Sequence, residues 1–267
     1  MFVLCVCKSV LDFWEELWKR EDAFLQGAKG EFRHGTSFVA VSSIAEQFYC
    51  EYKIENEFAL GEIPTENKYS GTILHDELLP TERITGAQFA KLVSRKEPTL
   101  AVMRVWGQVA GLKIVGTPDH IIWKEGRPLS LVELKTTRGD PAPLWEDQEN
   151  QTRIYGLLLD LMGLDCSKMK LAVVRLKSGV LSEEEKRAWI LLVSGALLGG
   201  KTEEIEEKYK GTMKVHVLRH DRALAARAVD AKAGYWLRAR EPTSSTSVGR
   251  CKACEYNSAC PKTLYKQ

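Results

Sequence analysis

The sequence predicts one α/β domain built on a mixed central sheet, with a helical part at its N-terminal end. Three observations lead to this prediction. Apolar residues recur mainly at helical spacing up to residue 98. Short runs rich in Val, Ile and Leu then follow, separated by turn residues. Helical and strand patterns alternate from there to residue 240, which is typical of an α/β fold.

Each element is expected from its own local pattern. The apolar spacing in residues 10–28 is that of an amphipathic helix. Ser43-Ile-Ala-Glu46 has the form of a capping box, so a second helix should start there and carry Cys50. The helices expected in order are residues 10–28, 43–58, 71–79, 86–96, 144–162, 182–199 and 221–240. The expected strands are residues 99–111, 112–123, 129–138, 169–177 and 213–220. Loops or turns are expected at 60–70, 124–128 and 241–249.

The composition is that of a globular protein. The chain has 267 residues, of which 44% are hydrophobic and 28% charged. No apolar run reaches the roughly 20 residues that a membrane span needs, and no signal peptide is recognised, so we expect a cytoplasmic protein. Of the seven cysteines, Cys5, Cys7 and Cys166 lie in apolar surroundings, which predicts buried thiols rather than disulfides.

Charge is distributed unevenly along the chain. The net charge is only +2, but residues 208–267 hold 13 Lys or Arg against 4 Asp or Glu. A basic end beside an acidic remainder is consistent with a polyanionic partner near a carboxylate-lined metal site, and equally with a solvated basic helix. The candidate phosphate contacts are Arg227, Arg238 and Arg240. Tyr235 and Trp236 are candidates for stacking a base, although at least one of these neighbours should lie in the core.

Two expected strands bring acidic residues together. Asp119 lies in the expected strand 112–123, and Glu133 and Lys135 lie within the next. Because alternate residues of a strand share a face, Glu133 and Lys135 should point the same way, and the hairpin can place Asp119 beside them. Carboxylates and a backbone carbonyl such as that of Leu134 are suitable ligands for Mg²⁺ or Mn²⁺, and a lysine can offset charge that develops on a phosphate. The apolar surroundings of Glu133 favour a functional role over an exposed surface strand.

These residues, with others in a fixed order, resemble a known family. Gln151 and Tyr155 are four residues apart on an expected helix and therefore lie on one face. The set resembles the RecB-like branch of the PD-(D/E)XK nucleases, which have a restriction-endonuclease-like core. In that branch the Gln and Tyr help to place substrate and metal. An upstream Gly-Thr-x-x-His motif supplies a further metal ligand, and here Gly71-Thr-Ile-Leu-His75 matches it.

Three cysteines near the C-terminal end have the spacing of metal ligands. They are Cys251, Cys254 and Cys260, with Pro261 directly after the last. Some RecB-like nucleases bind a [4Fe–4S] cluster through one cysteine before the core and three after it. The resemblance therefore implies Cys50 as the fourth ligand, and a cluster that joins the two ends of the domain. Zinc is the alternative, but its Cys₄ sites usually consist of two Cys-x₂-Cys pairs.

The resemblance spans residues 41–261 and implies an organisation and a function. Residues 1–98 would be the helical part, 99–240 the nuclease core and 241–267 the cysteine segment, all in one compact domain. The family most similar is that of the CRISPR-associated RecB-like exonucleases, followed by exonuclease V-type enzymes. We therefore expect a metal-dependent exonuclease acting on single-stranded DNA, in antiviral spacer acquisition or DNA repair. Spacer-integration proteins or a helicase would be its partners. Residues 1–40 exceed the usual length, and Glu51 follows Cys50 where many relatives have Pro.

Two other function classes are compatible with parts of the sequence. A non-cleaving DNA-binding or adaptor subunit could use the same fold, but the acidic residues and lysine are intact. A P-loop ATPase is suggested by Gly195-Ala-Leu-Leu-Gly-Gly-Lys-Thr202, which has the Walker A pattern. The expected helix from Ser182 runs into these glycines, however, so Gly199 and Gly200 are interpreted as a helix C-terminus. The sequence does not predict cleavage polarity or oligomeric state.

Overall fold

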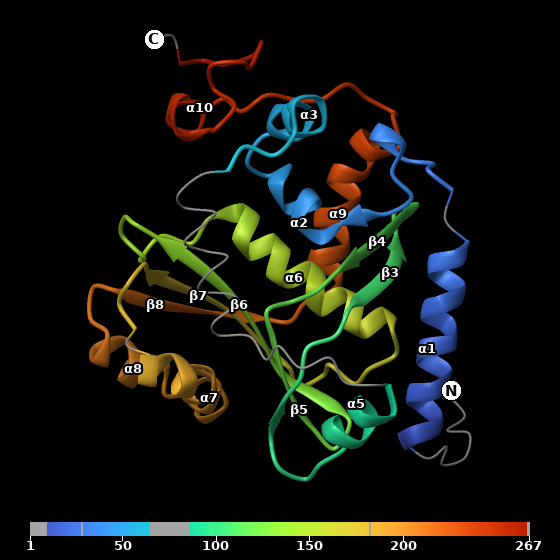
Figure 1. The fold of residues 1–267 in the computed structure, drawn as a ribbon, viewed down its shortest axis with the longest axis vertical. Coiled ribbons are helices and arrows are strands. Elements are labelled where there is room, and N and C mark those ends of the chain that lie inside the picture. The colour runs from blue at the N-terminus through green and yellow to red at the C-terminus, as the bar shows by residue number, and fades with distance from the viewer. Residues whose placement is uncertain (1–9, 28, 65–85, 182, 266–267) are drawn as a thin grey trace.

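The computed structural model describes residues 10–27, 29–64, 86–181 and 183–265. Figure 1 shows a mixed α/β fold, as predicted. The helices are α1 Val10–Gln26, the 3₁₀-helix η1 Arg33–Gly35, α2 Val41–Glu46, α3 Glu51–Leu60, α5 Gly86–Val93, α6 Glu146–Leu161, α7 Glu183–Gly199, α8 Thr202–Lys208, α9 Arg222–Trp236 and α10 Val248–Ala253. The strands are β1 Val39–Ala40, β2 Thr99–Leu100, β3 Val105–Val109, β4 Leu112–Gly116, β5 His120–Lys124, β6 Arg127–Thr137, β7 Lys170–Lys177 and β8 Met213–Arg219. The helix expected near residues 71–79 lies outside the described residues.

The larger sheet has five strands in the order β2-β5-β6-β7-β8. It is mixed, because β6 and β7 are parallel while the other neighbouring pairs are antiparallel. The turn between β5 and β6 uses Glu125 and Gly126, both at positive φ, which is the conformation of a tight hairpin turn. The long strand β6 therefore lies in the middle of the sheet, between β5 and β7.

The smaller sheet has three strands in the order β1-β4-β3. Strands β3 and β4 form a hairpin, whereas β1 pairs with β4 in parallel. The single strand expected over residues 112–123 is wrong, because its first half is β4 of this sheet and its second half is β5 of the larger one. Val39 and Ala40 make up β1, so the N-terminal part of the chain contributes backbone pairing to this sheet. Sequence reasoning missed β1 because two residues are too few to show a strand period.

Apolar side chains form two cores, one on each face of the five-stranded sheet. The larger core packs α6, α9 and the N-terminal helices against one face, and the smaller packs α7 and α8 against the other. The alternation along β6 is regular. Leu131 belongs to the larger core, and Val132 and Leu134 to the smaller. Residues Glu133 and Lys135 therefore share the face that α6 covers.

The predicted second helix is interrupted, which corrects the sequence interpretation. Helix α2 begins at Val41, two residues before the expected capping box, and no side chain caps its start. The chain turns after Glu46, and a new helix begins at Glu51 with Cys50 as its extended N-cap residue. Cys50 thus lies at the start of a helix rather than within one. The interruption frees its thiol to point toward the C-terminal segment, whose Ser245 amide donates to its Sγ at 3.3 Å.

The glycine-rich run that matches Walker A lies between two helices. Helix α7 ends at Gly199, and Gly200 has a φ of 70°. The Lys201 amide donates to the Ala196 carbonyl at 2.8 Å, which closes the end of the helix. This is a C-terminal glycine cap and not the strand-to-helix turn of a P-loop. The interpretation of Gly199 and Gly200 as a helix end is confirmed.

None of the helices in the described part of the chain is long and apolar enough to cross a bilayer.

Candidate active site

Asp119 lies where β5 begins, on the edge of β6. Its side chain is 7% exposed, and its Oδ2 accepts a hydrogen bond from the Leu134 amide at 2.7 Å. The pairing of β5 with β6 ends at His120 and Val132. Beyond that pair, the Asp119 carboxylate accepts the hydrogen bond that the Leu134 amide would otherwise donate to a neighbouring strand. The N–H and C=O of one strand residue point to the same edge. The Leu134 carbonyl therefore faces the same edge as Asp119, as a metal ligand would have to do.

Glu133 and Lys135 extend from β6 toward α6. Glu133 is 2% exposed, and its Oε1 accepts from Lys135 Nζ at 2.9 Å. Gln151 on α6 joins this pair: its Nε2 donates to Glu133 Oε1 at 2.7 Å, and its Oε1 accepts from Lys135 Nζ at 2.9 Å. Three side chains from two elements thus form a closed ring of hydrogen bonds. The structure brings together the residues that strand alternation predicted.

Tyr155 lies one turn further along α6 from Gln151. The Gln151 Nε2 atom donates to the Tyr155 hydroxyl at 3.4 Å, and the ring is 4% exposed. Sequence reasoning missed Gly116, at the end of β4, which makes room for this ring. A Cβ at Gly116 would lie 2.7 Å from Tyr155 Cε1 and 2.8 Å from Val41 Cγ2. Only glycine fits there, although its φ is ordinary.

The charges around Lys135 keep it protonated. Burial by itself would lower the pKa of Lys135, but the carboxylates of Glu133 and Asp119 outweigh it and hold the pKa above its ordinary value. Burial also raises the pKa of the Tyr155 hydroxyl, and the charge of Glu133 adds to this effect. Both groups therefore present protons. A protonated Lys135 is suited to an electrostatic role.

The donors fit a hard divalent cation. Asp119, Glu133 and the Leu134 carbonyl supply oxygen only, which Mg²⁺ and Mn²⁺ prefer. Two carboxylates beside one ammonium leave a net negative charge that favours a cation. Among the described residues, no group of three or more His, Cys, Asp or Glu is close enough to hold a metal ion. His75, the expected further ligand, lies outside the described residues.

The four predicted cluster cysteines line one pocket. Cys50 approaches from the start of α3, and the other three come from α10 and the segment after it. Tyr49 and Lys53 line the same pocket. The thiols are not joined in disulfides and, within the described chain, do not form a metal-ligating set as they stand. Burial raises the pKa of the Cys254 thiol. An all-thiol set suits soft metals, namely iron–sulfur clusters or zinc.

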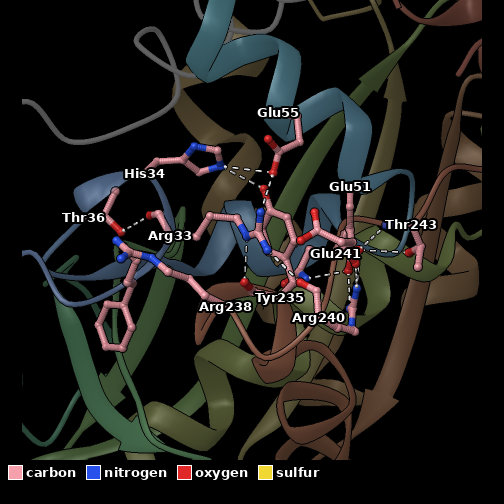
Figure 2. A network of polar contacts seen from close by, with 12 residues as sticks. Arg33, His34, Thr36, Glu51, Glu55, Tyr235, Arg238, Arg240, Glu241 and Thr243 are labelled. Atoms are coloured by element: carbon pink, nitrogen blue, oxygen red, sulfur yellow. Dashed lines mark hydrogen bonds and ion pairs between the residues drawn. The ribbon is translucent and has the colours of Figure 1, made fainter. Parts of the chain in front are cut away.

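A polar network beside this pocket uses two of the predicted DNA-binding arginines (Figure 2). Arg240 makes two hydrogen bonds of 2.5 and 2.6 Å with Glu51, whose side chain is fully buried. Glu51 also accepts from the Thr243 amide at 2.7 Å and from its hydroxyl at 2.9 Å. Arg238 donates to the Phe32 carbonyl at 2.7 Å. The Arg240 guanidinium therefore already neutralises a buried carboxylate, and its contact with DNA stays a prediction.

The other candidates for the DNA path lie on α9. Tyr235 and Trp236 are 0% and 1% exposed, so neither aromatic ring is available to stack a base. Trp236 Nε1 instead donates to Gln47 at 2.8 Å. Arg227 is exposed and remains a predicted phosphate contact.

Comparison with known proteins identifies the family. Residues 12–261 match the PD-(D/E)XK nuclease superfamily, whose members use divalent cations such as Mg²⁺ or Mn²⁺. No curated protein matches the chain. The solved structure described as the crystal structure of SSO0001 is similar, with 16% sequence identity and a TM-score of 0.45, over 97% of this chain and 99% of that one. The superfamily match includes both strands and the helix that carry the candidate site. The chain therefore belongs to the PD-(D/E)XK nuclease superfamily.

Proposed function

We propose that this chain is a metal-dependent DNA exonuclease of the RecB-like branch, acting on single-stranded DNA. The observation that carries the proposal is the ring of hydrogen bonds joining Glu133, Lys135 and Gln151, with Asp119 on the neighbouring edge. Asp119 and Glu133, with the Leu134 carbonyl and His75, would hold Mg²⁺ or Mn²⁺. When bound, the cation lowers the pKa of water and polarises the scissile phosphate.

The side chains around this position have separate tasks. Lys135 stays protonated and stabilises charge that develops on the phosphate. Gln151 fixes both Glu133 and Lys135, so neither has to reorganise during the reaction. Tyr155 lies on the same face of α6 as Gln151, and its hydroxyl stays protonated. The pair of Gln151 and Tyr155 on one helix, beside the acidic residues, supports the RecB-like assignment over other branches of the superfamily.

We further propose a [4Fe–4S] cluster on Cys50, Cys251, Cys254 and Cys260. Their placement around one pocket supports it, as does the distribution of one cysteine before the core and three after it. Anaerobically purified protein should absorb broadly near ~400 nm and contain about four iron atoms per chain. Stoichiometric zinc without sulfide would contradict this assignment and leave the nuclease proposal standing.

For the cellular role we propose spacer acquisition in CRISPR adaptation or DNA repair, with spacer-integration proteins or a helicase as partners. The two roles differ in the partner that should bind. Pull-down with purified integration proteins and with a repair helicase would separate them, and binding to neither would contradict both.

The nuclease proposal is tested with end-labelled single-stranded oligonucleotides. The chain should shorten them from one end with Mg²⁺ or Mn²⁺, and EDTA should stop the reaction. Asp119→Ala and Glu133→Ala should each remove cleavage and the rise in melting temperature that Mn²⁺ gives to the parent protein. Cleavage that persists in Glu133→Ala would place the active site elsewhere. Asp165→Ala is the matched control, since it removes an exposed carboxylate that lies outside the proposed ligand set and lines neither the cysteine pocket nor the cavity beside it.

A further inference from the structure

A second cavity lies where the start of α6 meets the cysteine segment. It has a volume of about 410 Å³ and borders the pocket that the cysteines line, with which it shares Tyr49 and Arg250. Its walls come from the turn between α2 and α3, the start of α6 and helix α10. The residues that line it include Tyr49, Trp145, Asp147, Gln148 and Arg250.

Trp145 is an exposed aromatic residue that is nevertheless held in place. It is the N-cap residue of α6, and its side chain is 48% exposed. The guanidinium carbon of Arg175 lies 5.8 Å from the centre of its ring. Arg175 itself is 4% exposed and donates to the Pro143 carbonyl. An exposed tryptophan on a fixed support is the arrangement that proteins use to stack a nucleobase.

The cavity is adjacent to the candidate active centre. Gln148 lines the cavity, and Gln151, three residues later on α6, bonds Glu133 and Lys135. Three residues advance a helix by about 4.5 Å along its axis. Arg175, beneath Trp145, pairs in register with Lys135 across β6 and β7. A strand whose phosphate lies at the active centre would therefore bring a neighbouring nucleotide to this cavity.

The charges of the cavity favour a base over a phosphate. The first turn of α6 carries Glu146, Asp147 and Glu149, which would repel a phosphate group. The Arg250 guanidinium is engaged by the backbone, because it donates to the Phe48 carbonyl at 2.8 Å and to the Tyr49 carbonyl at 3.2 Å. The Gln148 side chain lines the cavity, and its buried Oε1 atom has no hydrogen-bond partner in the described part of the chain.

We propose that this cavity binds one nucleobase of a single strand, stacked on Trp145, next to the phosphodiester held at the active centre. The inference rests on the proposed nuclease function and extends it by naming a base-binding subsite. Stacking is tolerant of sequence, because every base has a π-face. The subsite would hold an unpaired strand in register with Lys135 and would exclude a paired base, so it would give the enzyme the proposed preference for single strands.

The first test measures binding in a background that cannot cut, Asp119→Ala. Fluorescence anisotropy with a labelled single-stranded oligonucleotide should show Trp145→Ala binding about 5- to 150-fold more weakly, the range given by stacking of one base. Trp145→Phe keeps an aromatic face and should restore most of the affinity. Leu191→Ala, which truncates an exposed apolar side chain on α7, is the matched control and should bind like the parent.

The second test locates the base. A series of oligonucleotides, each with one abasic position, should bind more weakly at one position next to the cleavage point. That dependence should disappear in Trp145→Ala. Unchanged affinity together with an unchanged abasic profile would overturn the subsite and leave the nuclease proposal intact. Failure of the unsubstituted chain to cleave or bind any single strand would instead overturn the proposed function itself.

Discussion

Lys135 is the ammonium group of the candidate site and faces two buried carboxylates. Its raised pKa keeps it charged at neutral pH, so its loss should remove electrostatic stabilisation without removing the cation. We expect Lys135→Ala to retain Mn²⁺ binding and to slow single-turnover cleavage by roughly 10²–10³-fold. Lys124→Ala, at the other end of the sheet, should cleave at the parent rate. A Lys135→Ala variant that no longer binds Mn²⁺ would contradict this division of roles.

His34 gives a prediction about pH. Its ring stacks on Phe58 with centroids 4.0 Å apart, and its backbone is left-handed, with a φ of 62°. Burial lowers the pKa of His34 below its ordinary 6.5; Glu55 opposes this, whereas Arg33 and Arg238 add to it. The unfolded chain therefore binds the proton first as pH falls below 6.5, and the free energy of unfolding decreases.

The variant for this test is His34→Asn, because asparagine tolerates a positive φ. Urea unfolding at pH 7.0 and pH 5.5 should show that the parent loses more stability than the variant, by as much as about 1 kcal/mol. His216, whose pKa burial also lowers, is present in both proteins and cancels in the comparison. Equal losses in parent and variant would show that His34 does not contribute.

At the residue scale, side chains within one element were predictable and contacts between elements were not. Strand alternation placed Glu133 beside Lys135, and helical spacing placed Gln151 beside Tyr155. The need for glycine at position 116 arises only when α6 brings the Tyr155 ring onto β4. Arg175 was missed for the same reason, since its partners Pro143 and Trp145 come from a loop.

At the scale of elements, the break between α2 and α3 shows what a local pattern omits. The capping box at Ser43 predicts a helix start there, but α2 begins at Val41, whose side chain is buried. Packing of the apolar face thus outweighs a single cap. At the start of the second helix, the Glu51 carboxylate accepts hydrogen bonds from Arg240 and Thr243, which lie far along the sequence.

The link between α3 and the connector after α9 can be measured with two arginines that are close in sequence. Arg240→Ala should destabilise the protein by about 3 kcal/mol, because it leaves the fully buried Glu51 without its cation. Arg238→Ala removes one hydrogen bond from an exposed side chain to the Phe32 carbonyl, and should cost less than about 1 kcal/mol. Urea unfolding compares them. Similar losses in the two variants would contradict the assignment of Arg240 to a structural role.

At the scale of the whole molecule, distant parts of the chain meet at two places. Residues 39–40 pair with β4, and the N-terminal helices share the larger core with α9. The cysteine segment meets both ends of α3: Tyr49, just before the helix, donates to the Arg250 carbonyl at 2.6 Å, and Tyr256 donates at 2.9 Å to the carbonyl of Gly61, its C-cap residue. The sequence predicted this second meeting only through the family resemblance, which implied Cys50 as the fourth ligand beside the three C-terminal cysteines. The polar contacts that accompany it carry no periodic signal.

A cluster at this meeting point would make the ends of the chain one cooperative unit. Its binding energy exists only in the folded protein, so it becomes folding energy. We therefore expect Cys50→Ser to lose iron, sulfide and the absorbance near ~400 nm, and to melt at a lower temperature under anaerobic conditions. The polar links through Glu51 and Tyr256 should keep the variant folded, so its circular dichroism should remain that of an α/β protein.

Cys166 provides the control, since its thiol is 1% exposed in the larger core and lies outside the cysteine pocket. Cys166→Ala should lower the melting temperature through lost packing but keep the full iron content. The two variants thus separate destabilisation in general from loss of the cluster. If Cys50→Ser retained iron and melted like the parent, Cys50 would not be a ligand, and the polar contacts around Glu51 alone would join the two ends of the chain.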